Sequence, residues 1–220
     1  MFAIIALGLF RAQLPSSQIG RTVLKGLLVF LVSYGVYLLT RPFITLQYSV
    51  AGVYRYYLYH DNAYFLVWCF VSYLLLFGIR AIGQPSQYIL KATAYFAGFY
   101  SFLALSDILL NHKYLNSYVL FLLPLSRISL IFLSIAIIAC MARMRYWGRY
   151  LLIIVPPIGS GIASFIPLLQ VRSYTTAAMV LTASLFVISG CAFFIVASAA
   201  ASAAASAAAS AAARAAANAQ

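Results

Sequence analysis

The sequence predicts an all-α polytopic membrane protein: a bundle of about six transmembrane helices followed by a helical, Ala/Ser-rich C-terminal extension. The first observation is composition, because 65% of the 220 residues are hydrophobic and only 7% are charged. Soluble domains carry about 25% charged residues, so this chain cannot cover a water-facing surface and lipid must surround most of it. The second observation is that apolar runs of spanning length recur, separated by basic residues and by Pro or Gly.

The predicted spans lie near residues 22–40, 63–79, 92–110, 115–142, 150–169 and 174–197, and together form one bundle over residues 22–197. Between the first two spans, residues 44–62 are rich in tyrosine. They are predicted to form an interfacial or re-entrant segment, since tyrosine rings favour the headgroup level. Residues 1–21 are predicted to form an amphipathic segment on the membrane surface, and residues 198–220 a helical tail.

Basic residues outnumber acidic residues by 14 to 2, and they lie between apolar runs, where membrane-flanking anchors are found. This distribution favours a bilayer with anionic headgroups as a partner. It disfavours nucleic acid, which requires a basic patch on a soluble face.

The same residues predict the topology, because Lys and Arg stay on the side from which a chain inserts. The two sides carry Arg11, Arg21, Lys25, Arg80, Lys91, Arg143, Arg145, Arg149 and Arg214 against Arg41, Arg55, Lys113 and Arg172. Both termini are therefore predicted to face the cytoplasm, or the matrix. A bacterial inner membrane is preferred to the mitochondrial inner membrane.

Arg127 is the most informative single residue, because it falls about 11 residues into the fourth predicted span. An arginine at mid-membrane costs about 2.5–3.5 kcal/mol on insertion scales, so it should face protein, water or a charged partner. Asp107, near the end of the third span, is the only plausible acid. Three interpretations remain open: a structural ion pair or snorkelled arginine, an anion-binding site, or an interfacial arginine if the span starts after Pro124.

The fifth predicted span contains the sequence PPIGSG at residues 156–161. Pro156 and Pro157 remove backbone donors, while Gly159 and Gly161 allow another backbone to approach closely. Discontinuous helices of this kind often line binding sites, so these four residues join the two charged ones as candidates for a substrate- or anion-binding site. The alternative is a kinked helix packed against its neighbours.

Serine recurs every four residues in the tail, at Ser198, Ser202, Ser206 and Ser210. Small side chains let helices approach closely, and an isolated Ala-rich helix is only marginally stable in water. The four serines are therefore candidates for docking on other membrane subunits or on copies of this chain. The alternatives are a low-complexity tail that frays, or a placeholder stretch in which alanine stands for other side chains.

No catalytic set can be assembled from the sequence. It contains no Glu, no HExxH motif and no glycine-rich phosphate loop followed by Lys. His60 and His112 fall in predicted turns and are expected to be interfacial polar residues. The chain is therefore predicted to be no enzyme, to bind no metal and to need no cofactor.

The leading hypothesis is a non-catalytic integral subunit of a larger membrane complex, either a scaffold or a component that lines a pathway. The alternative is a small permease or flippase for an anionic or lipid-linked substrate, with its site at Arg127 and the broken fifth helix. An intramembrane enzyme ranks third.

Overall fold

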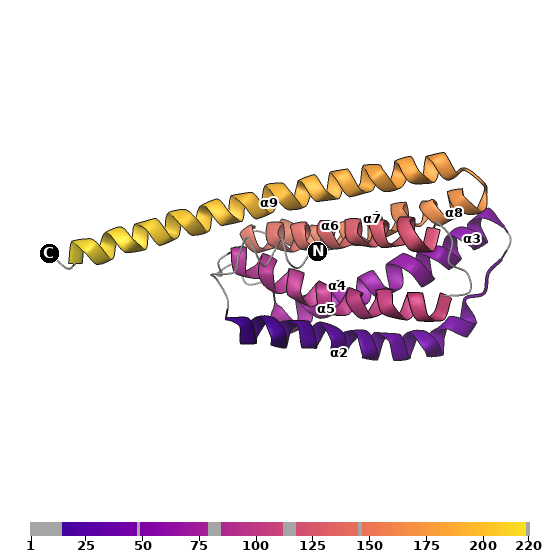
Figure 1. The fold of residues 1–220 in the computed structure, drawn as a ribbon, viewed down its shortest axis with the longest axis horizontal. Helices are drawn as coiled ribbons and strands as arrows, with labels where there is room; N and C mark the ends of the chain where they lie inside the picture. Colours follow the sequence, from indigo (N-terminus) through magenta and orange to yellow (C-terminus); the bar gives the residue numbers. More distant parts are fainter. Residues whose placement is uncertain (1–14, 48, 79–84, 112–117, 145–146, 219–220) are drawn as a thin grey trace.

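The computed structural model describes residues 15–47, 49–78, 85–111, 118–144 and 147–218, which form an all-α protein (Figure 1). Six helical segments are long and apolar enough to cross a membrane, so the predicted fold class is confirmed and the chain is an integral membrane protein. These segments are Ser16–Phe43, Val50–Phe77, Gln87–Asp107, Leu120–Arg143, Trp147–Val171 and Thr175–Ala217.

Several spans combine more than one helical element. The elements are α2 (Ser16–Thr40), the 3-10 turn η1 (Arg41–Phe43), α3 (Val50–Tyr57), the π-helical segment η2 (Leu58–Ala63), α4 (Tyr64–Phe77), α5 (Pro85–Asn111), the π-helical segment η4 (Tyr118–Leu122), α6 (Leu123–Arg143), the 3-10 helix η5 (Trp147–Ile154), α7 (Val155–Ala163), α8 (Phe165–Val171) and α9 (Thr175–Asn218).

Successive spans run in opposite directions, as short connections require. The start of α2 and the projecting C-terminal half of α9 therefore lie at the same end of the bundle (Figure 1). We call this end, which also holds the end of α6, the terminal end. The opposite end, where α2 leads to α3 and α8 leads to α9, is the far end.

Helix α5 lies at the centre of the bundle, packed against α2, α4, α6 and α9. Its buried face is mostly aromatic: Tyr95, Phe96 and Phe99 are inaccessible to solvent. Phe30 of α2 meets Phe99 edge to face, with ring centroids 5.6 Å apart. Aromatic pairs of this geometry contribute about 0.5–1.5 kcal/mol beyond area burial. Such contacts matter in lipid, where packing instead of water exclusion holds helices together.

Two glycines bring α2 and α5 into backbone contact. A Cβ on Gly98 would overlap the carbonyl oxygen of Val23, and a Cβ on Gly26 would overlap the carbonyl oxygen of Tyr95. Small residues at such an interface permit this approach. The first span is therefore fixed to the centre of the bundle along its glycine face, while side chains such as Leu39 point outwards.

The second span extends further toward its N-terminus than the sequence predicts. The sequence suggests an interfacial segment at 44–62, but α3, η2 and α4 form one continuous helical segment there. The reason is that the tyrosine hydroxyls find partners inside the protein. Tyr59 donates to Thr40 Oγ1 at 2.5 Å, and Tyr54 donates to the main-chain oxygen of Gly161 at 3.1 Å.

The predicted surface segment 1–21 is only partly covered, because residues 1–14 lie outside the described residues. From Ser16 onward the chain is already helix α2. Pro15 precedes the helix, and its carbonyl oxygen accepts a hydrogen bond from the amide of Gln18 at 2.9 Å. The last part of the predicted surface segment thus belongs to the first span.

The fifth span changes from the 3-10 helix η5 to α7 directly before the prolines, and it is interrupted a second time further along. Pro156 and Pro157 lie in the first turn of α7, where a missing N–H removes no helical hydrogen bond. The turn that separates α7 from α8 comes later, at Ser164. The prolines therefore start a helix instead of breaking one.

Helix α9 has 44 residues and is about 66 Å long. It packs along α6 with buried residues at intervals of three, four or seven positions: Ala178, Thr182, Ser189, Phe193, Ala197 and Ala200. From residue 205 to residue 217 every side chain is exposed, and this part projects beyond the other helices (Figure 1). The predicted helical extension is present.

Candidate functional site

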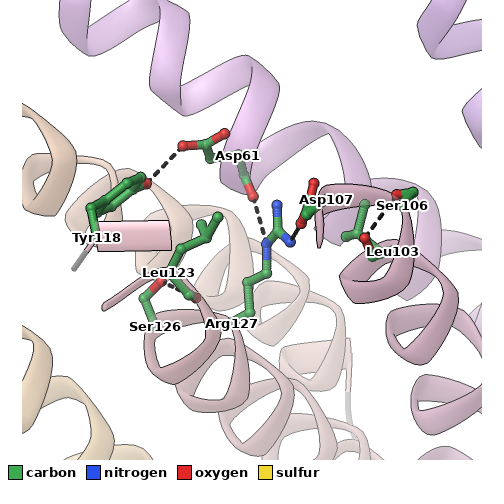
Figure 2. Close-up of polar contacts among 8 residues, drawn as sticks. All are labelled: Asp61, Leu103, Ser106, Asp107, Tyr118, Leu123, Ser126 and Arg127. Atoms are coloured by element: carbon green, nitrogen blue, oxygen red, sulfur yellow. Dashed lines mark hydrogen bonds and ion pairs between the residues drawn. The ribbon is translucent and has the colours of Figure 1, made fainter. Parts of the chain in front are cut away.

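A partly buried ion pair joins α5 and α6 near the far end of the bundle. The guanidinium of Arg127 donates from Nη1 to Oδ2 of Asp107 (Figure 2), and only 7% of Arg127 is exposed. Arg127 lies in the second turn of α6 and Asp107 lies four residues before the end of α5. An arginine inside a membrane needs a partner of this kind, and the pair anticipated from the sequence is present.

Asp61 of the π-helical segment η2 completes the cluster around Arg127. Its main-chain oxygen accepts a hydrogen bond from Nε of Arg127 at 3.3 Å. Its carboxylate points the other way, and its Oδ2 accepts a hydrogen bond from the hydroxyl of Tyr118 at 2.7 Å (Figure 2). Both acids of the chain therefore lie beside Arg127, the one buried arginine among the described residues. We call Asp61, Asp107, Tyr118 and Arg127 the polar cluster.

The π-helical geometry of η2 spreads three consecutive polar side chains toward different neighbours. His60 turns to α2, Asp61 to the polar cluster and Asn62 to the turn between α7 and α8. A π-helix bonds each amide to the carbonyl five residues back, and such insertions are frequent at functional sites. In this protein the insertion lets one short segment form polar contacts with four parts of the bundle: α2, η4, α6 and the turn between α7 and α8.

His60 is satisfied on both ring nitrogens. Nδ1 lies 2.8 Å from the hydroxyl of Tyr37, and Nε2 lies 3.1 Å from the main-chain oxygen of Ile44. Because a carbonyl oxygen only accepts, Nε2 carries the hydrogen and Nδ1 accepts from the tyrosine. A metal would have to displace one of these contacts, so we assign His60 a structural role. The other histidine, His112, lies outside the described residues.

Asn62 is almost fully buried and only half satisfied. Its Nδ2 donates to Oγ of Ser164 at 3.1 Å, and that hydroxyl donates to the main-chain oxygen of Ser160 at 2.7 Å. Among the described residues, no hydrogen-bond donor reaches Asn62 Oδ1. An unpaired buried amide oxygen costs about 1–3 kcal/mol, so a donor group that reached this oxygen would be stabilised there.

The glycines of the sequence PPIGSG pack against neighbouring helices. A Cβ on Gly159 would lie 2.7 Å from the side chain of Leu133 in α6. The main-chain oxygen of Gly161 accepts a hydrogen bond from the hydroxyl of Tyr54 at 3.1 Å. Within the described part of the chain, no hydrogen bond or ion pair joins either glycine to Arg127. These two candidates therefore do not form one site with the charged ones.

The four tail serines form hydrogen bonds within their own helix. Their hydroxyls donate to main-chain oxygens three or four residues earlier: Ser198 to Ile195, Ser202 to Ser198, Ser206 to Ser202 and Ser210 to Ala207, at 3.0, 3.0, 3.0 and 2.8 Å. All four side chains are exposed. Because each hydroxyl is satisfied internally, this surface can meet apolar groups without leaving a donor unpaired.

The chemistry available to the polar cluster is charge pairing and hydrogen bonding. Two hydroxyls lie beside it, but Ser106 and Ser126 donate to the main-chain oxygens of Leu103 and Leu123 in their own helices (Figure 2). Neither is paired with a base that would activate it as a nucleophile. In the described part of the chain, no group of three or more His, Cys, Asp or Glu side chains is arranged to hold a metal.

Sequence reasoning identified Arg127 and Asp107 but missed Asp61, Tyr118 and Asn62. The available signal was the run of three polar residues at positions 60–62 in an otherwise apolar and aromatic stretch. Such a run usually marks a turn, which is why the sequence predicts a turn at His60. Only the position of η2 inside the second span shows that these side chains are buried between helices.

Comparison with known protein families, with curated proteins and with solved structures finds no match for this chain. Conclusions about function therefore depend on the geometry alone.

Proposed function

We propose that this protein is a non-catalytic integral subunit of a larger membrane complex, and that α9 is the helix by which it docks. The observation that carries the proposal is the projecting part of α9. The residues from 205 to 217 are helical, yet none of their side chains packs on the bundle.

The length of α9 exceeds what a single crossing needs. Residues 175–197 cover about 34 Å, which already spans a hydrocarbon core of about 30 Å. Helix α9 stays in contact with α6 along this stretch through Phe132, whose ring lies 5.9 Å from that of Phe186 and 4.9 Å from that of Phe193. The rest of α9 is therefore not required for anchoring in the bilayer.

The composition of the projecting part favours a protein partner over water. An Ala-rich helix with little packing is only marginally stable in water. Its surface of Ala and internally bonded Ser suits close helix–helix contact, because small side chains bring backbones together and no hydroxyl is left unsatisfied. We expect the partner to be another subunit of the complex, with a second copy of this chain as the alternative.

Truncation after Ala204 tests this proposal, because residues 205–217, which it removes, are all exposed. The shortened chain should insert and unfold like the full chain but should no longer co-purify with its partners. As a matched control, replacing the removed residues with a Gly/Ser linker of equal length retains the mass without the helix and should also lose the partners. Co-purification of the truncated chain at the level of the full chain would contradict the docking role.

The proposed location is a bacterial inner membrane with both termini in the cytoplasm. Basic residues at the terminal end, including Lys25, Arg143 and Arg149, support this orientation through the positive-inside rule. A reporter fused after Gln220 should then be active in the cytoplasm, and activity on the opposite side would reverse the orientation.

The second candidate function is a small permease for an anionic or lipid-linked substrate, favoured by the guanidinium in the polar cluster. Because Arg127 already pairs with Asp107, an anion would have to displace that carboxylate. Arg127→Lys retains the charge but loses the planar guanidinium, whereas Arg127→Ala leaves Asp107 without its cation. If the protein is a permease, both variants should lose transport. In Arg127→Lys the protein should still fold. Normal transport by well-folded Arg127→Lys would reject the guanidinium site.

A further inference from the structure

An apolar groove runs along the outside of the bundle between α2 and α4. Its volume is about 290 Å³ and its accessible lining is wholly apolar. The main lining side chains are Leu28, Val29 and Val32 of α2 with Trp68, Leu75 and Leu76 of α4. From Trp68 to Leu76 the groove follows α4 for about 12 Å.

The groove lies where α2 packs on α5 and diverges from α4. The glycine contact at Gly26 and Gly98 draws this part of α2 against α5, whereas α2 meets α4 nearer the far end, where Tyr64 donates to the main-chain oxygen of Ser33. Ser72, the one polar residue in the lining, turns its hydroxyl to Tyr95 at 2.7 Å and to the main chain of its own helix. The open surface of the groove is therefore hydrocarbon only.

One end of the groove is positively charged. Lys25 precedes Leu28 by about one helical turn, and its Nζ lies 5.1 Å from the ring centroid of Phe77, the residue that follows Leu76 in α4. Arg21 lies one turn before Lys25 on the same side of α2. Both basic side chains are exposed, so they can bind an anion from the bilayer.

The spacing along α2 matches the depth at which a phosphate lies. Arg21 and Arg41 are 20 residues apart, or about 30 Å, which equals the thickness of a hydrocarbon core. Arg21 therefore lies at the headgroup level when α2 spans the membrane, and the flexible side chain of Lys25 reaches the same level by snorkelling. The apolar groove begins immediately below.

We propose that this groove binds a phospholipid with an anionic headgroup, with one acyl chain between α2 and α4 and the phosphate held by Lys25 and Arg21. The apolar lining takes the chain, and the two cations select the headgroup. The site is independent of the proposed docking by α9, because it lies on the opposite side of α5.

The test uses the full-length protein purified in a neutral detergent and titrated with phosphatidylglycerol or with phosphatidylcholine, with thermal stability as the readout. Phosphatidylglycerol should stabilise the protein at lower concentration than phosphatidylcholine. Since a basic residue at a membrane surface adds about 1 kcal/mol of attraction, Lys25→Gln should weaken phosphatidylglycerol binding about fivefold. Lys25→Gln combined with Arg21→Gln should weaken it about 25-fold.

A matched control is Arg149→Gln, which removes a half-buried basic residue outside the groove. It should leave the titration unchanged. Glycerol phosphate, which has the headgroup chemistry but no acyl chain, should not stabilise the protein. Val32→Trp, which fills the groove from an exposed position, should weaken binding of both lipids.

Three outcomes would overturn the proposal. Equal binding of phosphatidylglycerol and phosphatidylcholine would show that Lys25 and Arg21 do not select the headgroup. An effect of Arg149→Gln as large as that of Lys25→Gln would show that the lipid is attracted by the basic surface in general. Lipid-independent dimers that crosslink through Leu28→Cys or Leu75→Cys would show that a helix of a second copy occupies the groove.

Discussion

Helices α5 and α9 are both long and apolar, yet they occupy opposite environments. Helix α5 is enclosed by four other helices, whereas α9 touches the bundle along one stripe and then leaves it (Figure 1). Neither sequence shows a pronounced amphipathic face. Their difference lies in side-chain shape: α5 carries aromatic rings and a glycine at its contacts, while α9, apart from Phe186 and Phe193, meets the bundle mainly through Ala, Ser and Thr.

This comparison shows that apolarity marks a helix as membrane-embedded without saying whether it is central or peripheral. Lipid tails are as apolar as leucine, so a helix gains little by burying an apolar face against protein. What favours the central position is close packing, which requires rings that interlock and glycines that let backbones meet. Three pairs of variants test this interpretation.

The largest difference is expected between Phe99→Ala and Phe194→Ala. Phe99 is inaccessible and packs against Phe30, so its truncation should cost about 3 kcal/mol of unfolding free energy. Phe194 of α9 is 67% exposed to the surroundings of the bundle, so its truncation should cost less than about 0.5 kcal/mol. Unfolding in mixed micelles with increasing dodecyl sulfate measures both. Equal losses would mean that α9 is as tightly integrated as α5.

An intermediate difference is expected between Gly98→Ala and Gly190→Ala. The added methyl group on Gly98 would overlap the main chain of Val23, which should cost about 1–3 kcal/mol through overpacking and displacement of α2. The same methyl group on Gly190 meets nothing within 4 Å. Alanine should raise the stability of α9 there by up to about 1 kcal/mol through helix propensity. Unfolding in mixed micelles is again the measurement.

A stable Gly98→Ala protein would show that α2 and α5 can separate without loss, and the central role of α5 would need revision. A destabilised Gly190→Ala protein would show that α9 makes a close contact at Gly190 with a partner or with a second copy.

The smallest effect on the bundle is expected at Ser206. Ser206→Leu and Ser206→Ala should each change the unfolding free energy by less than about 0.5 kcal/mol, because this exposed residue packs on nothing in the described structure. The two variants should differ in partner binding: leucine adds bulk to a small-residue surface, while alanine preserves that surface. Co-purification retained by Ser206→Ala and lost by Ser206→Leu would support docking through small residues. Equal retention would place the contact elsewhere.

Most of the fold could be predicted from the sequence, and part of the candidate site. Apolar runs predicted six spans, and the Ala/Ser stretch predicted the helical extension. The pairing of Arg127 with Asp107 followed from the high cost of an isolated charge in lipid. Asp61, Tyr118 and Asn62 could not be predicted, because they reach their positions through a π-helical insertion whose neighbours come from distant parts of the chain.

The sequence alone is enough to predict that this chain lies in a membrane and roughly which residues cross the bilayer. Transfer of apolar and charged residues into lipid is a local property that each segment carries alone. Three features are visible only in the tertiary structure: α5 is central, α7 begins directly before residues 156–161, and the tyrosine-rich segment lies inside a span. Those outcomes depend on whether rings, glycines and hydroxyls meet partners on other helices. The periodicity of a single segment carries no information about such partners.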